Sequence, residues 1–144
     1  MKIFLFLSVV LCSMAASAGE SKVIDTDLCN VVAHPKQFDT KQIRVRARLF
    51  KGMHGSALFD ERCGKGVSLW YLKEAQDNPD FKKLDEILIH HGNVGTSDKR
   101  IVATFTGRFF HKKKDEVTHK ATMVLETNTV EGIDVKYDTS PSGH

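Results

Sequence analysis

The sequence has few aromatic residues and lacks the repeats that would name a structural class directly. Aromatic residues make up 8% of its 144 residues, with a single tryptophan and three prolines. There is no glycine periodicity, which excludes a collagen, and no long heptad pattern, which excludes a coiled coil. Hydrophobic residues still make up 41% of the chain and charged residues 27%, which is typical of one globular domain.

Strong catalytic motifs are also missing. His54-Gly55-Ser56 lacks the flanking pattern of a nucleophile elbow. Neither a phosphate-binding loop nor a paired-carboxylate signature is present. We therefore expect a noncatalytic protein, and the sequence indicates no catalytic residue, no metal ligand and no cofactor.

A targeting segment is expected at the start of the chain. Lys2 precedes an apolar run over residues 3–11, and Ala16-Ser17-Ala18 supplies the small residues that a signal peptidase reads. The run is too short to span a bilayer. We expect residues 1–18 to be a secretory signal peptide, residues 19–137 to form a single domain, and residues 138–144 to be a flexible tail. No second long apolar segment follows, so we predict a protein without a membrane span, located in the periplasm or outside the cell.

The charge of the mature chain is close to neutral. Removing Lys2 from the 21 basic residues leaves 20 against 18 acidic ones, so the net charge falls from +3 to +2. This balance argues against a protein that binds polyanions in bulk. Nucleic acid is a possible partner that the sequence does not favour.

Two cysteines remain after the leader, which takes Cys12 with it. Cys29 and Cys63 are expected to pair, because two cysteines in an exported domain most often form a disulfide. Closing the loop between them contributes roughly 3 to 4 kcal/mol in a chain-entropy estimate. The alternatives are a redox centre, whose cysteines usually lie two residues apart, and a zinc site, which needs four ligands.

Alternation of apolar and polar residues predicts five strands. The clearest covers residues 41–50, in which one face is apolar and the other carries three arginines: Ile43, Val45, Ala47 and Leu49 against Arg44, Arg46 and Arg48. Further strands are predicted over residues 56–60, 67–72, 100–110 and 120–127, with Val130 and Ile133 as an extension of the last. Gly107 marks a bulge in the fourth strand.

Two helices accompany these strands. The first is expected to begin at Thr26-Asp27, with Thr26 as its cap, and to end at His34-Pro35. The second begins at Asn78-Pro79 and ends near Gly92. Because every strand has one apolar face, we predict a mainly β fold, a five-stranded antiparallel barrel like the OB-fold, with an N-terminal helix and a helix between strands 3 and 4. The main alternative is a flat antiparallel sheet covered by the two helices.

Two stretches carry a resemblance to a known group. Residues 38–47, FDTKQIRVRA, resemble the opening strand of small exported bacterial OB-fold proteins, and residues 106–109, TGRF, resemble a later strand motif of the same proteins. The resemblance covers residues 26 to 130 in pattern and order. It implies the OB-fold, an exported location and a binding role, and it supplies no catalytic residues.

The candidate ligand-binding residues lie on the polar faces of the strands. Three like charges spaced about 7 Å apart repel one another, so Arg44, Arg46 and Arg48 need either neighbouring carboxylates or an anionic ligand. Trp70 and Phe110 have the outward parity of their strands and are predicted to line the same surface. The alternative is a solvated face with cross-strand ion pairs to residues such as Glu126.

Three functions stay open from the sequence. The first is an exported OB-fold module that holds an oligosaccharide, an anionic molecule or a protein with its barrel face and the loops at 51–55 and 111–119. The second is a metal-dependent secreted hydrolase acting on nucleic acid, for which the seven histidines would have to converge. The third is a structural partner in envelope stress or assembly.

Overall fold

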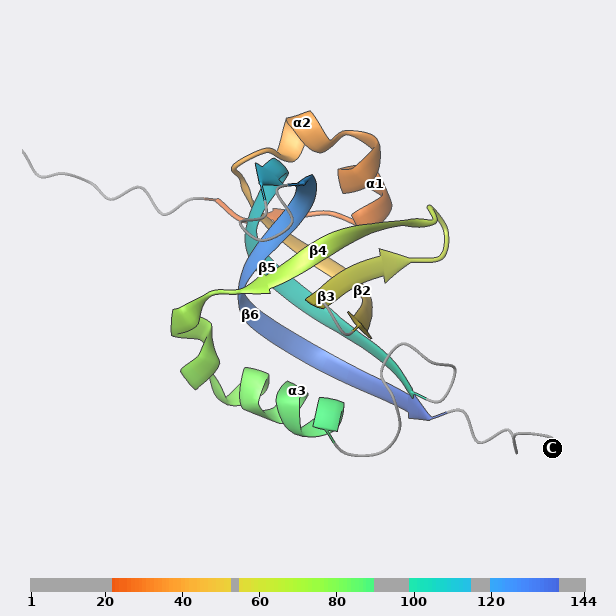
Figure 1. Ribbon diagram of the computed structural model, residues 1–144, viewed down its shortest axis with the longest axis vertical. Helices are drawn as coiled ribbons and strands as arrows, with labels where there is room; N and C mark the ends of the chain where they lie inside the picture. Colours follow the sequence, from red (N-terminus) through yellow and green to blue (C-terminus); the bar gives the residue numbers. More distant parts are fainter. Residues whose placement is uncertain (1–21, 53–54, 90–98, 115–119, 138–144) are drawn as a thin grey trace, which may run out of the picture.

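A computed structural model describes residues 22–52, 55–89, 99–114 and 120–137 (Figure 1). One sheet contains six strands: β1 (Ile24–Asp25), β2 (Gln42–Gly52), β3 (Gly55–Asp60), β4 (Lys65–Tyr71), β5 (Lys99–Lys114) and β6 (Ala121–Tyr137). Helical segments are α1 (Leu28–Ala33), α2 (Pro35–Phe38), a 3-10 turn η1 (Lys73–Asp77) and α3 (Pro79–Ile89). The predicted leader, the predicted tail and Gly92 lie outside the described residues.

The strands of the sheet form a ring. Their order is β1-β2-β3-β4-β6-β5, and β5 also pairs with β2. The prediction of five antiparallel strands is wrong in two respects. A sixth strand, β1, pairs with the start of β2, and two of the pairings, β1–β2 and β4–β6, are parallel. The chain is mainly β, as predicted.

The alternation in β2 decides which side of the sheet becomes the core. Ile43, Val45, Ala47 and Leu49 are all buried, whereas Arg44 and Arg46 are exposed on the opposite face. β5 continues the same interior with Ile101, Ala103, Phe105 and Phe109. Because a strand turns successive side chains to opposite faces, one hydrophobic face per strand is enough to fill the ring.

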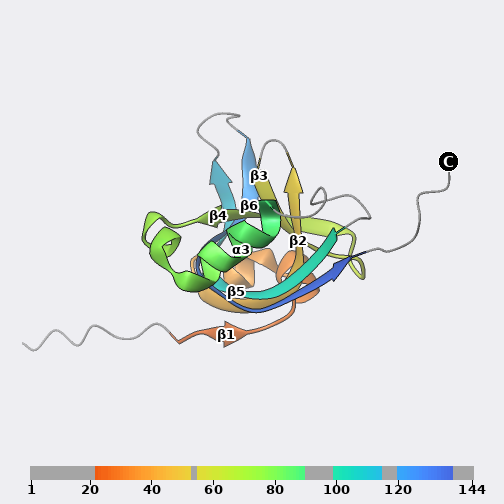
Figure 2. The same cartoon turned by 90° about the horizontal axis from the view of Figure 1, so that it is seen from below.

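Helices lie at opposite ends of the sheet (Figures 1 and 2). At one end, α1 and α2 bury Leu28, Val31 and Phe38. The predicted short helix is confirmed, but its cap is Asp27, whose carboxylate accepts from the Asn30 backbone N–H at 3.0 Å. Pro35, predicted only to end this helix, also opens α2.

At the other end of the sheet, α3 is anchored by its apolar stripe. Asn78 Oδ1 accepts from the Asp80 backbone N–H at 2.8 Å, as predicted for a capping residue. Phe81 and Leu84 are buried, and the Phe81 ring meets Tyr71 edge to face, with centroids 5.3 Å apart. The buried Lys99 donates from Nζ to the Ile87 carbonyl and so ties the end of α3 to β5. No helix in the described ranges is long and apolar enough to cross a membrane.

β5 and β6 form a hairpin longer than the sequence predicts. β5 runs to Lys114, so residues 111–114, which the sequence places in the loop expected at 111–119, belong to a strand. β6 runs to Tyr137, past Val130 and Ile133. The register between the two strands shifts between Thr106 and Gly107, where one step on β5 spans two residues of β6, so the irregularity predicted at Gly107 is present but the extra residue lies on β6 and not on β5. The register shifts again between Phe110 and Lys113. These irregularities bend the hairpin around the core.

Candidate functional site

The arginine row, which consists of Arg44, Arg46 and Arg48, lies on the outer face of β2 beside β5. Arg44 forms ion pairs with Asp25 at 3.3 Å and Glu131 at 3.5 Å. Arg46 pairs with Asp134 and donates to the Gly132 carbonyl at 3.0 Å. These acids come from β1 and β6, and they offset the repulsion within the row. The predicted partner Glu126 is not among them.

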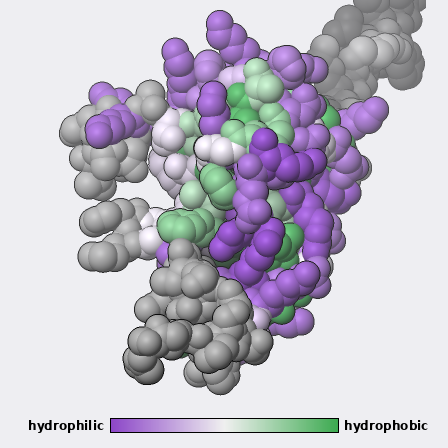
Figure 3. Space-filling view, turned by 90° about the vertical axis from the view of Figure 1, so that its right-hand side faces the viewer, coloured by the Kyte–Doolittle hydropathy of each residue, from purple (hydrophilic) through white to green (hydrophobic). Residues whose placement is uncertain are grey.

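Arg48 differs from the other two arginines in its exposure and surroundings. Its side chain is 25% exposed, against 43% for Arg44, and it pairs with Glu61 at 3.0 Å. Glu61 also pairs with Arg100 at 3.5 Å and is therefore shared between two guanidinium groups. One face of the molecule is mainly hydrophilic and carries smaller hydrophobic areas (Figure 3).

An apolar pocket of about 410 Å³ lies next to Arg48 on the outer face of β2, β3 and β4. It is lined by Arg48, Phe50, Ala57, Leu58, Phe59 and Gly66. The strand registers explain the hollow. Phe59 faces Arg48 on one side and Gly66 on the other, and Phe50 faces Ala57. Because Ala57 and Gly66 are small, they leave space between the two phenylalanine rings. Phe50 is 44% exposed.

A second pocket of about 260 Å³, lined mostly by charged residues, adjoins the first, because Arg48 and Phe59 line both. Its other lining groups include Arg46, Arg62 and Arg100 together with Asp60 and Glu61. A ligand in the apolar pocket would therefore have several guanidinium groups within reach at one rim. We call the two pockets together the β2–β4 pocket.

Trp70 and Phe110 form a separate group around Lys113. The Lys113 Nζ lies 5.2 Å from the Trp70 ring centroid and 4.5 Å from the Phe110 ring centroid, and it pairs with Glu126. Trp70 and Gly66 have the same parity on β4 and lie about 13 Å apart at the usual strand rise. The structure thus brings Trp70 and Phe110 together around Lys113, whereas the sequence predicted them on the surface of the arginine row.

Sequence reasoning missed several residues of these sites. Phe50 and Phe59 had the outward parity of their strands, which was the available signal. No sequence signal pointed to Lys113, because the orientation of its side chain depends on the register shift in β5. Nothing in the spacing of Glu61 relates it to Arg48 and Arg100.

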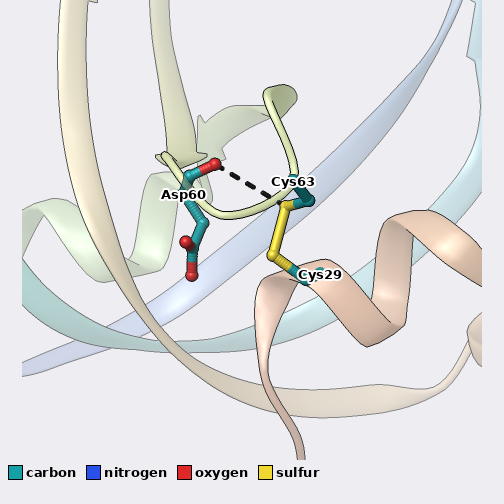
Figure 4. Close-up of side chains that lie close together, drawn as sticks. All are labelled: Cys29, Asp60 and Cys63. Atoms are coloured by element: carbon teal, nitrogen blue, oxygen red, sulfur yellow. Dashed lines mark hydrogen bonds between the residues drawn. A yellow bond between two sulfur atoms is a disulfide. The ribbon is translucent and has the colours of Figure 1, made fainter.

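Cys29 and Cys63 form the predicted disulfide (Figure 4). It joins α1 to the loop after β3, and the two Cα atoms are 5.4 Å apart. Asp60 completes the only group of three potential metal ligands among the described residues, but the two sulfurs are bonded to each other and offer no thiolate. Cys63 Sγ lies 3.6 Å from the Asp60 backbone oxygen.

The Asp60 carboxylate is held by Arg62. Arg62 donates from Nη2 at 2.7 Å, from Nε at 3.0 Å and from its backbone N–H at 3.0 Å. The side-chain hydrogen bonds from Arg62, followed by the backbone hydrogen bond, hold the pKa of the Asp60 carboxyl below its ordinary value of 3.8. Asp60 therefore stays ionised at the rim of the β2–β4 pocket.

Of the seven histidines, the structure describes His34 and His111. Both line one shallow pocket together with Pro35 and Lys36. The other histidines, and parts of the loops expected at 51–55 and 111–119, lie outside the described residues: His54, His90, His91, His119 and His144. No observation on the described residues favours a metal-dependent hydrolase.

Comparison of the chain with known protein families, with curated proteins and with solved structures found no match.

Proposed function

We propose that this protein is an exported, noncatalytic binding module with an OB-fold-like barrel. Support for the barrel comes from the ring of β2, β3, β4, β6 and β5, and from α3, which lies between β4 and β5 in chain order, the third and fourth strands of these five along the sequence. β1 is then an addition outside the five-stranded core. Export is supported by the leader-like residues 1–18 and by the disulfide, since such bonds persist in oxidising compartments.

The observation that carries the binding role is the β2–β4 pocket. In OB-fold proteins the face of the second and third barrel strands holds ligands, and in this chain those strands are β3 and β4. A volume of about 410 Å³ falls within the usual range of small-molecule sites, and its lining combines aromatic rings with one guanidinium. The arginine row contributes mainly through Arg48, which lines both parts of the pocket. Arg46 lines only the second part and is paired with Asp134, and Arg44 lines neither part.

The chemistry of the pocket narrows the choice among the partner classes expected from the sequence. Phe50 and Phe59 offer apolar contact. Arg48 and Arg100 share the single carboxylate of Glu61, so this group of three carries one excess positive charge, which attracts a negatively charged group to the two guanidinium groups. Of the anionic, oligosaccharide and protein partners expected from the sequence, we favour an anionic molecule with an apolar or aromatic body. An oligosaccharide would find few neutral hydrogen-bonding side chains in this lining.

The test uses 8-anilinonaphthalene-1-sulfonate, an aromatic anion that fluoresces in apolar surroundings. Phe50→Ser and Arg48→Gln should each raise its apparent Kd by about tenfold, which corresponds to about 1.4 kcal/mol. Ile89→Ser serves as the matched control, because Ile89 is an exposed apolar residue away from the pocket, at 77% exposure. Equal affinity in the wild type, the two pocket variants and the control would rule the pocket out as a binding site.

A further inference from the structure

A lysine ammonium is enclosed by two aromatic rings and a carboxylate on the outer face of the sheet. We call Trp70, Phe110 and Glu126, which surround the Lys113 Nζ, the ammonium cage. The Nζ lies 4.5 Å from the centroid of the Phe110 ring and 5.2 Å from that of Trp70, both within the range of cation–π attraction. Glu126 supplies the opposite charge, and its side chain is 18% exposed.

The ammonium cage depends on the irregularity in β5. Phe110 pairs with Val124 and Lys113 pairs with Thr122, so three residues of β5 span what two residues span on β6. In a regular strand, residues three apart point to opposite faces. The extra residue brings Lys113 to the same face as Phe110, and bulges of this kind often re-aim a side chain beside a functional site.

The ammonium cage also has a floor. Val124 lies between Phe110 on β5 and Ser68 on β4, and it shares the face of Glu126 on β6. It is 0% exposed, although it does not belong to the hydrophobic core inside the ring. Its burial therefore comes from side chains on the outer face. Two aromatic rings and one carboxylate, on a face that also buries Val124, thus surround a single ammonium group.

We propose that the ammonium cage is a binding site for an alkylammonium group, with Lys113 as its internal occupant. Two aromatic faces with a carboxylate are the arrangement that recognises quaternary and methylated amines. Glu126 is largely withdrawn from water and needs a cation beside it. An external ammonium that displaces Lys113 keeps Glu126 paired, so the exchange replaces one charge with another. The Lys113 side chain is 32% exposed and can swing into solvent. This site is independent of the β2–β4 pocket.

Trp70 makes the proposal testable, because it is the only tryptophan in the chain. Lys113→Gln empties the ammonium cage and leaves its walls in place. Titration with choline, followed by Trp70 fluorescence, should show binding to Lys113→Gln at least about tenfold tighter than to the wild type, because a tethered competitor acts at millimolar effective concentration. 3,3-Dimethyl-1-butanol, the neutral isostere of choline, should bind neither protein measurably.

Controls separate the site from general charge effects. Lys112→Gln removes the same charge from the adjacent, exposed residue and should behave as the wild type does. The double variant with Lys113→Gln and Glu126→Gln should bind choline more weakly than Lys113→Gln alone. A parallel titration with Nα-acetyl-lysine methylamide identifies the source of the cation. Tighter choline binding points to a small quaternary amine, and tighter binding of the lysine derivative points to a lysine side chain of a partner protein.

A second measurement covers the case in which Lys113→Gln fails to fold. In the wild type, excess choline should shift the NMR signal of the Trp70 indole N–H, and the neutral isostere should leave that signal in place. If the signal stays in place in choline, or shifts equally with both compounds, the ammonium cage binds no external cation and the proposal is wrong.

Discussion

Gly107 on β5 lies directly against the backbone of Glu126 and Thr127 on β6. A Cβ atom added to Gly107 would come within 2.7 Å of the Thr127 Cα and would overlap the Glu126 peptide. The register between the two strands shifts at this residue, so the bend of the long hairpin occurs where the two backbones touch. The absent side chain thus permits the close approach of β5 and β6.

We predict that Gly107→Ala is destabilised by at least about 1 to 3 kcal/mol, because neither backbone can move without disturbing the core. Chemical denaturation checks the value. Gly52→Ala is the matched control, since the nearest atoms to its added Cβ are 3.9 Å away and ordinary contact results. Equal stability of the two variants would show that the hairpin adapts at Gly107.

The disulfide gives a second prediction. Cys29 and Cys63 are 34 residues apart in sequence, and removal of the bond by Cys29→Ser with Cys63→Ser should cost roughly 3 to 4 kcal/mol of unfolding free energy. Reductant should lower the melting temperature of the wild type to that of the double variant. The melting temperature of the double variant itself should not respond to reductant, and a response there would point to an effect unrelated to this bond.

Asp60 should make stability depend on pH. Its folded pKa lies below the unfolded value near 3.8, so its pairing with Arg62 stabilises the protein above that pH and ceases to do so as pH falls through the folded pKa. Arg62→Gln should therefore be less stable than the wild type at neutral pH, with the difference shrinking in acid.

Carbon NMR titration tests the cause directly. The pKa of the Asp60 carboxyl should rise toward 3.8 in Arg62→Gln. It should stay low in Arg100→Gln, which loses the same charge nearby but not a bond to Asp60. A carboxyl pKa that is equal in the wild type and Arg62→Gln would assign the lowered pKa to some other group.

The features predictable from sequence are those that local pattern determines. Alternation in β2 gives both the buried face and the outward-facing arginine row, and the spacing and number of cysteines give the disulfide. β1 could not be predicted in this way, because a strand of two residues shows no periodicity. It forms only by pairing with the start of β2, at Ile43 and Arg44. The added length of β5 and β6 was hidden by polar residues, which a two-stranded ribbon tolerates on both faces.

The partners of the arginine row show a second limit to what can be predicted from the sequence. Arg46 meets Asp134 and Gly132, which are 88 and 86 residues away along the chain. Such pairs follow from the ring closure of β2 and β5 and from the bulges of β6, and no local pattern encodes them. The ammonium cage is hidden for the same reason, since its lysine is turned by a register shift between two strands.

The pair of Arg46 and Asp134 should contribute little to stability, although it lies at the centre of the arginine row. Their side chains are 46% and 67% exposed, and pairs of this kind couple by less than about 1 kcal/mol. We expect a double-mutant cycle of Arg46→Gln and Asp134→Asn to give a coupling energy below that value, and 1 M salt to abolish it.

The cycle also decides how binding experiments on the row are interpreted. If coupling is small, the variant with Arg44, Arg46 and Arg48 all replaced by serine will stay folded, and its loss of affinity for an anion reports binding alone. Arg48→Ser should then account for most of that loss, because Arg48 alone of the three lines the apolar pocket. A coupling energy well above 1 kcal/mol would instead make the arginine row a structural element, and any loss of binding in the triple variant would follow from a distorted sheet.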